Sequence, residues 1–364
     1  MRITRCLKKP FWVSDSKKKT EKKVSADRSG VKELRFKAGL FIPKEGEVLL
    51  SFHLPYKANR LAIGDINGDG SPEVIIASGS KIRTYRLGVD LKSLDEFNVP
   101  STDEVIWIDT ITLNRNGKDV ILITTMRDGE VTSYIYELKD SKYVQLWEAK
   151  NRFIRKLGKG IIAQEFNKAE GYEGEVFFLE YNNGNFTKGE SLKLPRGINI
   201  YDFQRLGSSD GKEAILAWDE NGYLGLYNEK GMRLWMSKED FGGFATTFKK
   251  ESPTIMVDRG KWSVKDRLII SGGEVLVPKR KPLLGMARGL GYKDSEIKGL
   301  WWNGISIEER NFIERAGGEL LDYDMLGDRI AVLSKVPFTI KAKNLLKGES
   351  PFGVMLYIFA IKGR

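Results

Sequence analysis

The residues best suited to chemistry are four oxygen-bearing side chains in one short segment. Asp65, Asn67 and Asp69 alternate along the chain, and Glu73 follows four residues later. Alternate oxygens in a tight loop can converge on one point, and the glycines between them let the backbone turn inward. Ca²⁺ prefers several oxygen ligands in flexible geometry, whereas transition metals favour softer ligands. The segment therefore predicts one structural Ca²⁺ site, with a Gly/Asn/Asp-rich turn without metal as the alternative.

The sequence around these ligands places them between two strands. An EF-hand begins in the same way but needs a glutamate at its twelfth position, where this chain has Ile76. The segment instead leads into an apolar run, Val74–Ala77, with β character. Its pattern, GDINGDGSPEVII, resembles the FG-GAP/VCBS repeat of integrin-α-like β-propellers. The resemblance implies a repeat protein with Ca²⁺ ligands at Asp65, Asn67, Asp69 and Glu73. Only this unit keeps the acidic loop, so an array of several Ca²⁺ sites is not expected.

The remaining composition excludes several kinds of site. The chain has one cysteine, Cys6, and one histidine, His53, so it can form neither an intrachain disulfide nor a Cys/His zinc site. Any Ser-His-Asp or Cys-His arrangement would have to use His53, and nothing around that residue suggests one. No phosphate-binding loop is present. Paired carboxylates such as Asp322 and Asp324 occur, but the sequence does not show that they share a pocket. We therefore predict a protein that is not an enzyme.

The elements that position these residues repeat along the chain. An apolar run, a polar loop and two further runs joined by a tight turn recur at a spacing typical of propeller blades. Asn-Gly, Asp-Gly and Gly-Gly pairs mark the hairpins, because primed turns need positive φ. The seven units begin at Leu61, Val105, Gly160, Ile198, Phe244, Leu283 and Glu319. The sequence predicts an all-β fold, a seven-bladed β-propeller of four-stranded antiparallel blades. Glu33–Gly39 and Val48–Leu54 precede the first unit and could pair with the last blade, which would clasp the termini together.

The charge of the chain divides it into two parts. Residues 1–38 hold 13 Lys and Arg against 4 Asp and Glu, and so account for +9 of the net charge of +11. Such blocks are usually disordered. We therefore predict a basic, disordered tail over residues 1–30 and a single propeller domain over 31–364. No run of 18 apolar residues is present, so no membrane span is expected, and the tail shows no export signal.

Three functions remain open at this point. The sequence favours a non-catalytic scaffold or binding protein that holds a protein or polysaccharide partner at a propeller face. The alternatives are a propeller enzyme acting on polysaccharide, and a protein that binds anionic surfaces through residues 1–30. The family resemblance, rather than the N-terminus, implies a location in the bacterial periplasm or cell envelope.

Overall fold

The structure is a computed structural model of the 364-residue chain. It describes residues 2–3 and 45–361, apart from gaps at 101–102, 114–116, 170, 183, 208–210, 251–259, 284–290, 337–340, 342–345, 347–349 and 351. The described part is built almost entirely of β-strands, and none of its residues forms a helix long and apolar enough to cross a membrane. The predicted tail, apart from its first few residues, lies outside the described residues.

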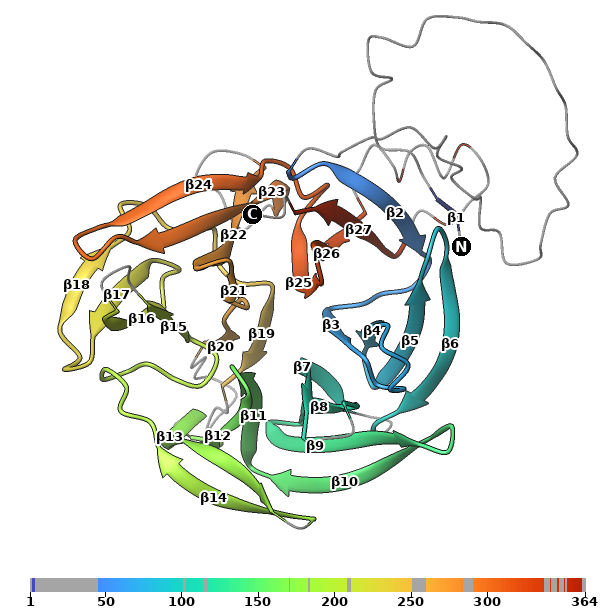
Figure 1. Ribbon diagram of the computed structural model, residues 1–364, viewed down its shortest axis with the longest axis horizontal. Coiled ribbons are helices and arrows are strands. Elements are labelled where there is room, and N and C mark those ends of the chain that lie inside the picture. Colours follow the sequence, from blue (N-terminus) through green and yellow to red (C-terminus); the bar gives the residue numbers. More distant parts are fainter. Residues whose placement is uncertain are drawn as a thin grey trace, which may run out of the picture.

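The strands form six antiparallel blades arranged around one axis, with the first strand of each blade innermost in the first five (Figure 1). The first three blades consist of β3–β6 (Arg60–Gly64, Glu73–Ser78, Lys81–Leu87, Leu91–Asn98), β7–β10 (Glu104–Thr112, Asp119–Arg127, Glu130–Lys139, Lys142–Lys150) and β11–β14 (Arg152–Leu157, Gly160–Asn167, Gly171–Asn182, Asn185–Ser191). The next three consist of β15–β18 (Phe203–Gly207, Glu213–Trp218, Leu224–Asn228, Arg233–Met236), β21–β24 (Ile269–Ser271, Glu274–Pro282, Tyr292–Trp302, Ile307–Ile313) and β25–β27 (Leu320–Leu326, Arg329–Lys335, Val354–Ala360) with β2 (Val48–Leu54). The chain is therefore a β-propeller of four-stranded antiparallel blades.

The ring closes by pairing the two ends of the described chain. β2 is the fourth strand of the sixth blade, where it pairs antiparallel with β27, with Phe52 opposite Leu356. All seven residues of β27 are buried, and Phe52 and Leu54 are fully buried beside them. The two-residue strand β1 (Arg2–Ile3) adds to the outer edge of β2. The prediction that Val48–Leu54 pairs with the last blade is confirmed, whereas Glu33–Gly39, which was predicted to pair there as well, lies outside the described residues.

The blade count differs from the prediction, because six four-stranded blades are found in the described residues where seven were expected. The predicted fifth and sixth units share one blade. The turn at Gly272–Gly273 joins β21 to β22, the turn at Asn303–Gly304 joins β23 to β24, and β22 pairs directly with β23. Two hairpin signals thus fall in a single sheet, and counting one blade per signal overestimates the number.

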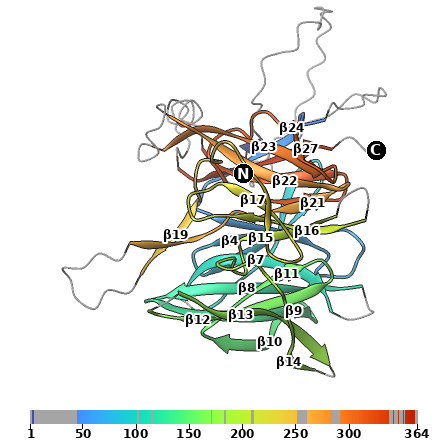
Figure 2. The ribbon, with the colours of Figure 1, turned by 90° about the vertical axis from the view of Figure 1, so that its left-hand side faces the viewer.

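The remaining run of the predicted fifth unit forms a separate hairpin. β19 (Thr246–Lys249) pairs with β20 (Lys261–Val264) between the fourth and fifth blades. This two-stranded hairpin extends beyond the ring in Figure 2, whereas the other strands lie within the body of the disc. The chain returns from the hairpin through residues 265–268, which are buried near the axis before β21 begins. The hairpin therefore brings an additional segment to the centre of the propeller.

Apolar side chains hold neighbouring blades against each other. One buried cluster joins the first and sixth blades, with Leu61 and Val74 packed among Leu333 and Leu356. Further clusters of the same kind lie between the first and second blades and between the fifth and sixth. Burying apolar area contributes about 25 cal/mol per Å², so these contacts supply most of the free energy that holds the ring together.

Candidate functional site

The predicted calcium loop folds around its first carboxylate. Asp65 Oδ1 accepts hydrogen bonds from the N–H groups of Gly68 and Asp69, at 2.8 and 3.2 Å, and Oδ2 accepts one from Gly70 at 2.8 Å. Both of these glycines adopt positive φ, as the tight turn requires. The side chain of Asn67 donates to Glu73 Oε1 at 2.5 Å. The structure thus brings all four predicted ligands into one loop between β3 and β4.

A guanidinium already balances part of the loop's charge. Arg86, on the neighbouring strand β5, lies 2.5 Å from Asp69 Oδ2 and 4.0 Å from Glu73 Oε1. Glu73 is fully buried, and burial together with the charges of Asp69 and Asp65 raises its pKa to about 7. Within the described residues, no group of three or more His, Cys, Asp or Glu side chains is arranged to hold a metal ion. Hydrogen bonds from its own N–H groups and the ion pair with Arg86 therefore hold the loop in this conformation.

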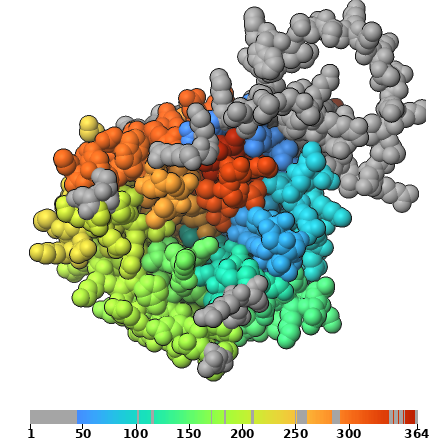
Figure 3. All heavy atoms as spheres, in the orientation of Figure 1, coloured from blue at the N-terminus to red at the C-terminus, as the bar shows by residue number. Residues whose placement is uncertain are grey.

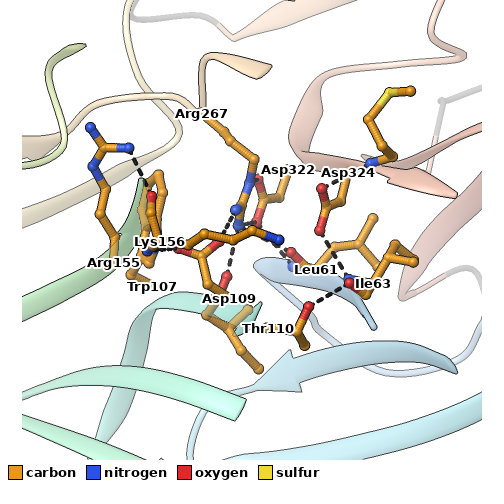
Figure 4. Close-up of polar contacts among 12 residues, drawn as sticks. Leu61, Ile63, Trp107, Asp109, Thr110, Arg155, Lys156, Arg267, Asp322 and Asp324 are labelled. Atoms are coloured by element: carbon orange, nitrogen blue, oxygen red, sulfur yellow. Dashed lines mark hydrogen bonds and ion pairs between the residues drawn. The ribbon is translucent and has the colours of Figure 1, made fainter. Parts of the chain in front are cut away.

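A second cluster of charges lies on the axis of the ring, where Arg267 contacts three blades (Figure 4). Its guanidinium forms an ion pair with Asp109 of β7 and lies 3.4 Å from both oxygens of Asp322 of β25. It also donates to the carbonyl oxygens of Ile108, at 2.8 Å, and Leu61, at 3.2 Å. Burial alone would lower the pKa of Arg267, but the carboxylates of Asp322 and Asp109 raise it well above its usual value.

The same axial carboxylates also bind the backbone of adjacent inner strands. Asp322 accepts a hydrogen bond from Leu61 N at 3.0 Å, and Asp324 accepts one from Ile63 N at 2.9 Å, which joins the sixth blade to the first. Asp109 Oδ2 accepts from Lys156 N at 2.8 Å, which joins the second blade to the third. These acids hold neighbouring inner strands in register, which is a structural use.

Above this cluster the ring encloses a cavity of 440 Å³, which we call the axial funnel. Figure 3 shows a hollow at the centre of the ring. The wall of the funnel includes Trp107, Asp109, Lys156, Arg205, Arg267 and Asp324. Most of these residues come from inner strands or from the segment before β21, so all blades but one contribute to a wall whose shape the closed ring fixes.

The funnel carries more positive than negative charge. Lys156 and Arg205 are exposed in its wall, and neither forms an ion pair with a described residue. Arg155, also in the wall, is buried and donates to the carbonyl oxygens of Ile200 and Phe203, and burial lowers its pKa to about 10. Burial raises the pKa of Asp324 to about 6 despite the opposing charge of Arg267. The free charges of the funnel are therefore cationic.

Sequence reasoning missed most of this axial site. Asp322 and Asp324 were noted as a pair of acids without a common pocket, and the structure shows that Asp324 lines the funnel while Asp322 lies in the ion-pair cluster beside it. Nothing in the sequence singled out Arg267, which lies 158 positions from Asp109. The residue before a strand carries no periodic signal, so only the closed ring reveals that Arg267 reaches the axis.

Comparisons with known proteins do not assign the chain to a family. No protein-family model matches the chain, and no curated protein matches it. The chain is similar to the PQQ-bound aldose sugar dehydrogenase from Streptomyces coelicolor, at 11% identity and TM-score 0.46, over 86% of this chain and 97% of that one. It is also similar to a chain of the mitotic checkpoint complex, at 9% identity and TM-score 0.46, over 94% and 99%. A protein from Lactobacillus plantarum matches at 7% identity and TM-score 0.41, over 76% and 77%. The FG-GAP/VCBS resemblance and the envelope location that it implies stay predictions.

Proposed function

We propose that the protein is a non-catalytic binding propeller that holds an acidic group of a protein partner in its axial funnel. The observation that carries the proposal is the pair of exposed cations, Lys156 and Arg205, in the wall of a 440 Å³ cavity on the axis. Charged side chains without ion-pair partners are available to a carboxylate, and hydrogen bonds between ionised groups are the strong ones. A funnel of fixed shape also loses little conformational entropy when a ligand binds.

The state of the funnel's acids argues against catalysis. Asp109 accepts hydrogen bonds from Trp107 Nε1 and Lys156 N while paired with Arg267, so it is a poor general base. Asp324, with its pKa of about 6, is the residue best suited to proton transfer. Its neighbour with catalytic potential is Asp109, and that carboxylate is committed to holding blades together. A two-carboxylate mechanism of the glycosidase kind needs both acids to be available.

The aromatic residues of the funnel favour a protein partner over a polysaccharide. Sugars stack on exposed aromatic faces, but Trp107, Tyr201 and Phe203 are each no more than 3% exposed, and the remaining aromatic residue of the wall, Phe178, is half-buried. Their rings pack among themselves, with Trp107 and Tyr201 at 4.5 Å between centroids. An acidic side chain or chain terminus needs cations rather than a flat ring, and the funnel offers cations. The polysaccharide-acting enzyme thus remains the second candidate.

The proposal predicts that a labelled tri-glutamate peptide binds in the funnel. Replacing both Lys156 and Arg205 by glutamate is expected to weaken binding at least about tenfold, which corresponds to ~1.4 kcal/mol. Fluorescence anisotropy titrations at two salt concentrations measure the effect, and the affinity of the unmodified protein should fall as salt screens the charges.

A matched variant controls for the change in net charge. Lys92 and Lys142 are exposed on outer strands β6 and β10, so Lys92→Glu with Lys142→Glu changes the charge equally without touching the funnel. This control should bind the peptide within about twofold of the unmodified protein after correction for long-range screening. Equal weakening by both double variants would show that net charge alone attracts the peptide.

For the loop of Asp65, Asn67, Asp69 and Glu73 we also propose one structural Ca²⁺. The loop holds three acidic side chains, and the single guanidinium of Arg86 contacts only Asp69 and Glu73, which leaves negative charge that a divalent ion relieves. Each ionised carboxylate has about four lone-pair sites, so the hydrogen bonds within the loop leave capacity for an ion. Since no three acids are yet arranged around one point, binding would have to turn Asp69 away from Arg86.

Calcium is expected to stabilise the folded protein by mass action. At free Ca²⁺ a hundredfold above its dissociation constant the gain is about 2.7 kcal/mol. Melting curves in EDTA and in millimolar CaCl₂ measure it, and Asp65→Ala with Asp69→Ala should abolish the difference. A melting temperature of the unmodified protein that does not respond to Ca²⁺ would establish the loop as a plain turn.

A further inference from the structure

A buried arginine near the Arg267 cluster has no hydrogen-bond partner among the described residues. Arg60, the first residue of β3, is 1% exposed, and none of its three guanidinium nitrogens has an acceptor in the part of the chain that the structure describes. Its guanidinium carbon lies 5.3 Å from the centroid of Trp107. The carboxylates of Asp322 and Asp266 act on Arg60 through their charge but lie beyond hydrogen-bond distance. Buried polar groups of folded proteins almost always have partners, so Arg60 requires an explanation.

Three further polar atoms lack a partner among the described residues, and contacts between the rings of Trp107, Tyr201 and Tyr172 connect their surroundings to Arg60. They are Asp202 Oδ1, Tyr172 Oη and Trp262 Nε1. The charges of Asp202 and Arg60 both act on the hydroxyl of Tyr172, so both groups lie near it. The rings of Tyr172 and Trp262 lie 6.1 Å apart. Four orphan groups in one region indicate a shared missing partner rather than four separate defects.

The β19–β20 hairpin covers this region. Trp262 of β20 packs so closely on Gly171 that a Cβ atom there would lie 2.3 Å from the indole ring. Gly171 also has φ of +82°, which a larger residue would adopt only with strain. On its other side Lys250 lies 4.2 Å from the Trp262 ring centroid. The hairpin is therefore seated on the third blade as a cover, and a ligand beneath it would be shielded from solvent.

The chemistry of the four groups defines the ligand. Arg60, Tyr172 and Trp262 offer donors, which suit the oxygens of an anion. Asp202 Oδ1 offers an acceptor, because an ionised carboxylate accepts hydrogen bonds at both oxygens, and Oδ2 already accepts from Asn199 N at 2.7 Å. An acidic acceptor beside several donors suits an oxyanion that keeps one hydroxyl group, as hydrogen phosphate does, and disfavours sulfate, which has none at neutral pH.

We propose that Arg60, Tyr172, Trp262 and Asp202 form an internal binding site for a phosphate-type oxyanion beneath the β19–β20 hairpin. The site is separate from the axial funnel, because none of its four residues lines the funnel wall. Arg60 supplies the charge, Tyr172 and Trp262 complete the donor set, and Asp202 accepts the ligand's hydroxyl. The hairpin must open for the ion to enter, so exchange is slow compared with binding in the open funnel.

Thermal unfolding with inorganic phosphate tests the site, at constant ionic strength and neutral pH. Saturating phosphate should raise the melting temperature of the full chain by at least about 2 °C, and sulfate should raise it by less. In Arg60→Met the phosphate-dependent rise should vanish, whatever the melting temperature of that variant without phosphate. If Arg60→Met fails to fold, Tyr172→Phe, which removes one oxygen, should reduce the rise instead.

Two further variants test whether phosphate binds at this site rather than in the funnel, and whether Asp202 gives the site its preference for phosphate over sulfate. Lys156→Glu with Arg205→Glu should keep the full response to phosphate, because these residues line the funnel only. Asp202→Asn should reduce the preference for phosphate over sulfate. No rise with phosphate in the unmodified protein, or a rise that survives Arg60→Met, would overturn the proposal. Equal responses to phosphate and sulfate would overturn the role of Asp202.

Discussion

Replacing Arg267 by methionine is expected to lower the free energy of unfolding by about 3–5 kcal/mol, because removing one partner of a buried ion pair leaves uncompensated charge. The change leaves Asp109 and Asp322 buried on the axis without the cation between them. It also removes the donors to the carbonyl oxygens of Leu61 and Ile108. Urea unfolding followed by tryptophan fluorescence measures the loss.

The large loss of stability in Arg267→Met should depend on the burial of this arginine. Arg329 forms an ion pair at 3.6 Å with Asp328, and both side chains are well exposed, so Arg329→Met should change stability by no more than about 1 kcal/mol. Combining Arg267→Met with Asp109→Asn and Asp322→Asn should restore part of the lost stability, because no buried charge is then left unpaired. A loss below 1 kcal/mol for Arg267→Met would show that the axial cluster does not hold the blades.

Removing the closing strand is expected to prevent the ring from folding. A chain that begins after Leu54 lacks β2, and with it the fully buried Phe52 and Leu54. Losing a large buried side chain lowers the free energy of unfolding by about 2–5 kcal/mol. Several such losses approach the total free energy of unfolding of a typical domain, about 5–15 kcal/mol. The exposed edge of β27 would also present unpaired N–H and C=O groups.

Deletion of residues 2–28 provides the comparison for this truncation. It removes only β1 among the described strands and keeps β2 in place. The shorter deletion should unfold cooperatively at nearly the melting temperature of the full chain, whereas the longer one should show no cooperative transition by circular dichroism. A large fall in melting temperature for the shorter deletion would contradict the prediction that the basic tail lies outside the fold.

Local signals in the sequence were sufficient to predict most of the strands and hairpin turns. The second predicted unit, with runs at Val105–Leu113, Asp119–Thr125 and Glu130–Leu138, corresponds closely to β7, β8 and β9. Glycines at the predicted turns, such as Gly129 and Gly222, adopt the positive φ that the turns require. Alternation of apolar residues and turn chemistry depend on neighbours in the chain, so a single sequence shows them.

The blade count could not be predicted in the same way. Gly272–Gly273 and Asn303–Gly304 are equally good hairpin signals, and the sequence does not show that the strands between them pair with each other. The innermost strand of the third blade, Arg152–Leu157, was also missed as a separate run. Pairing between strands is a long-range property, and it decides how many hairpins make one blade.

The axial site was even harder to predict from the sequence, because long-range contacts assemble it. Asp109, Asp322 and Asp324 were visible as acids, but Arg267, the ion-pair partner of Asp109 and Asp322, comes from the distant segment before β21. Arg60 begins an ordinary apolar strand, so its burial without a partner becomes apparent only once the ring is closed. Sequence patterns indicate which side of a strand faces inward, and they do not indicate which charges meet at the axis.

The most direct test of the binding proposal is a crystal structure of the protein grown with the tri-glutamate peptide. We expect peptide carboxylates within hydrogen-bond distance of Lys156 and Arg205 in the axial funnel, with the Arg267 cluster unchanged beneath them. Peptide bound only on the outer strands, with an unoccupied funnel, would contradict the account.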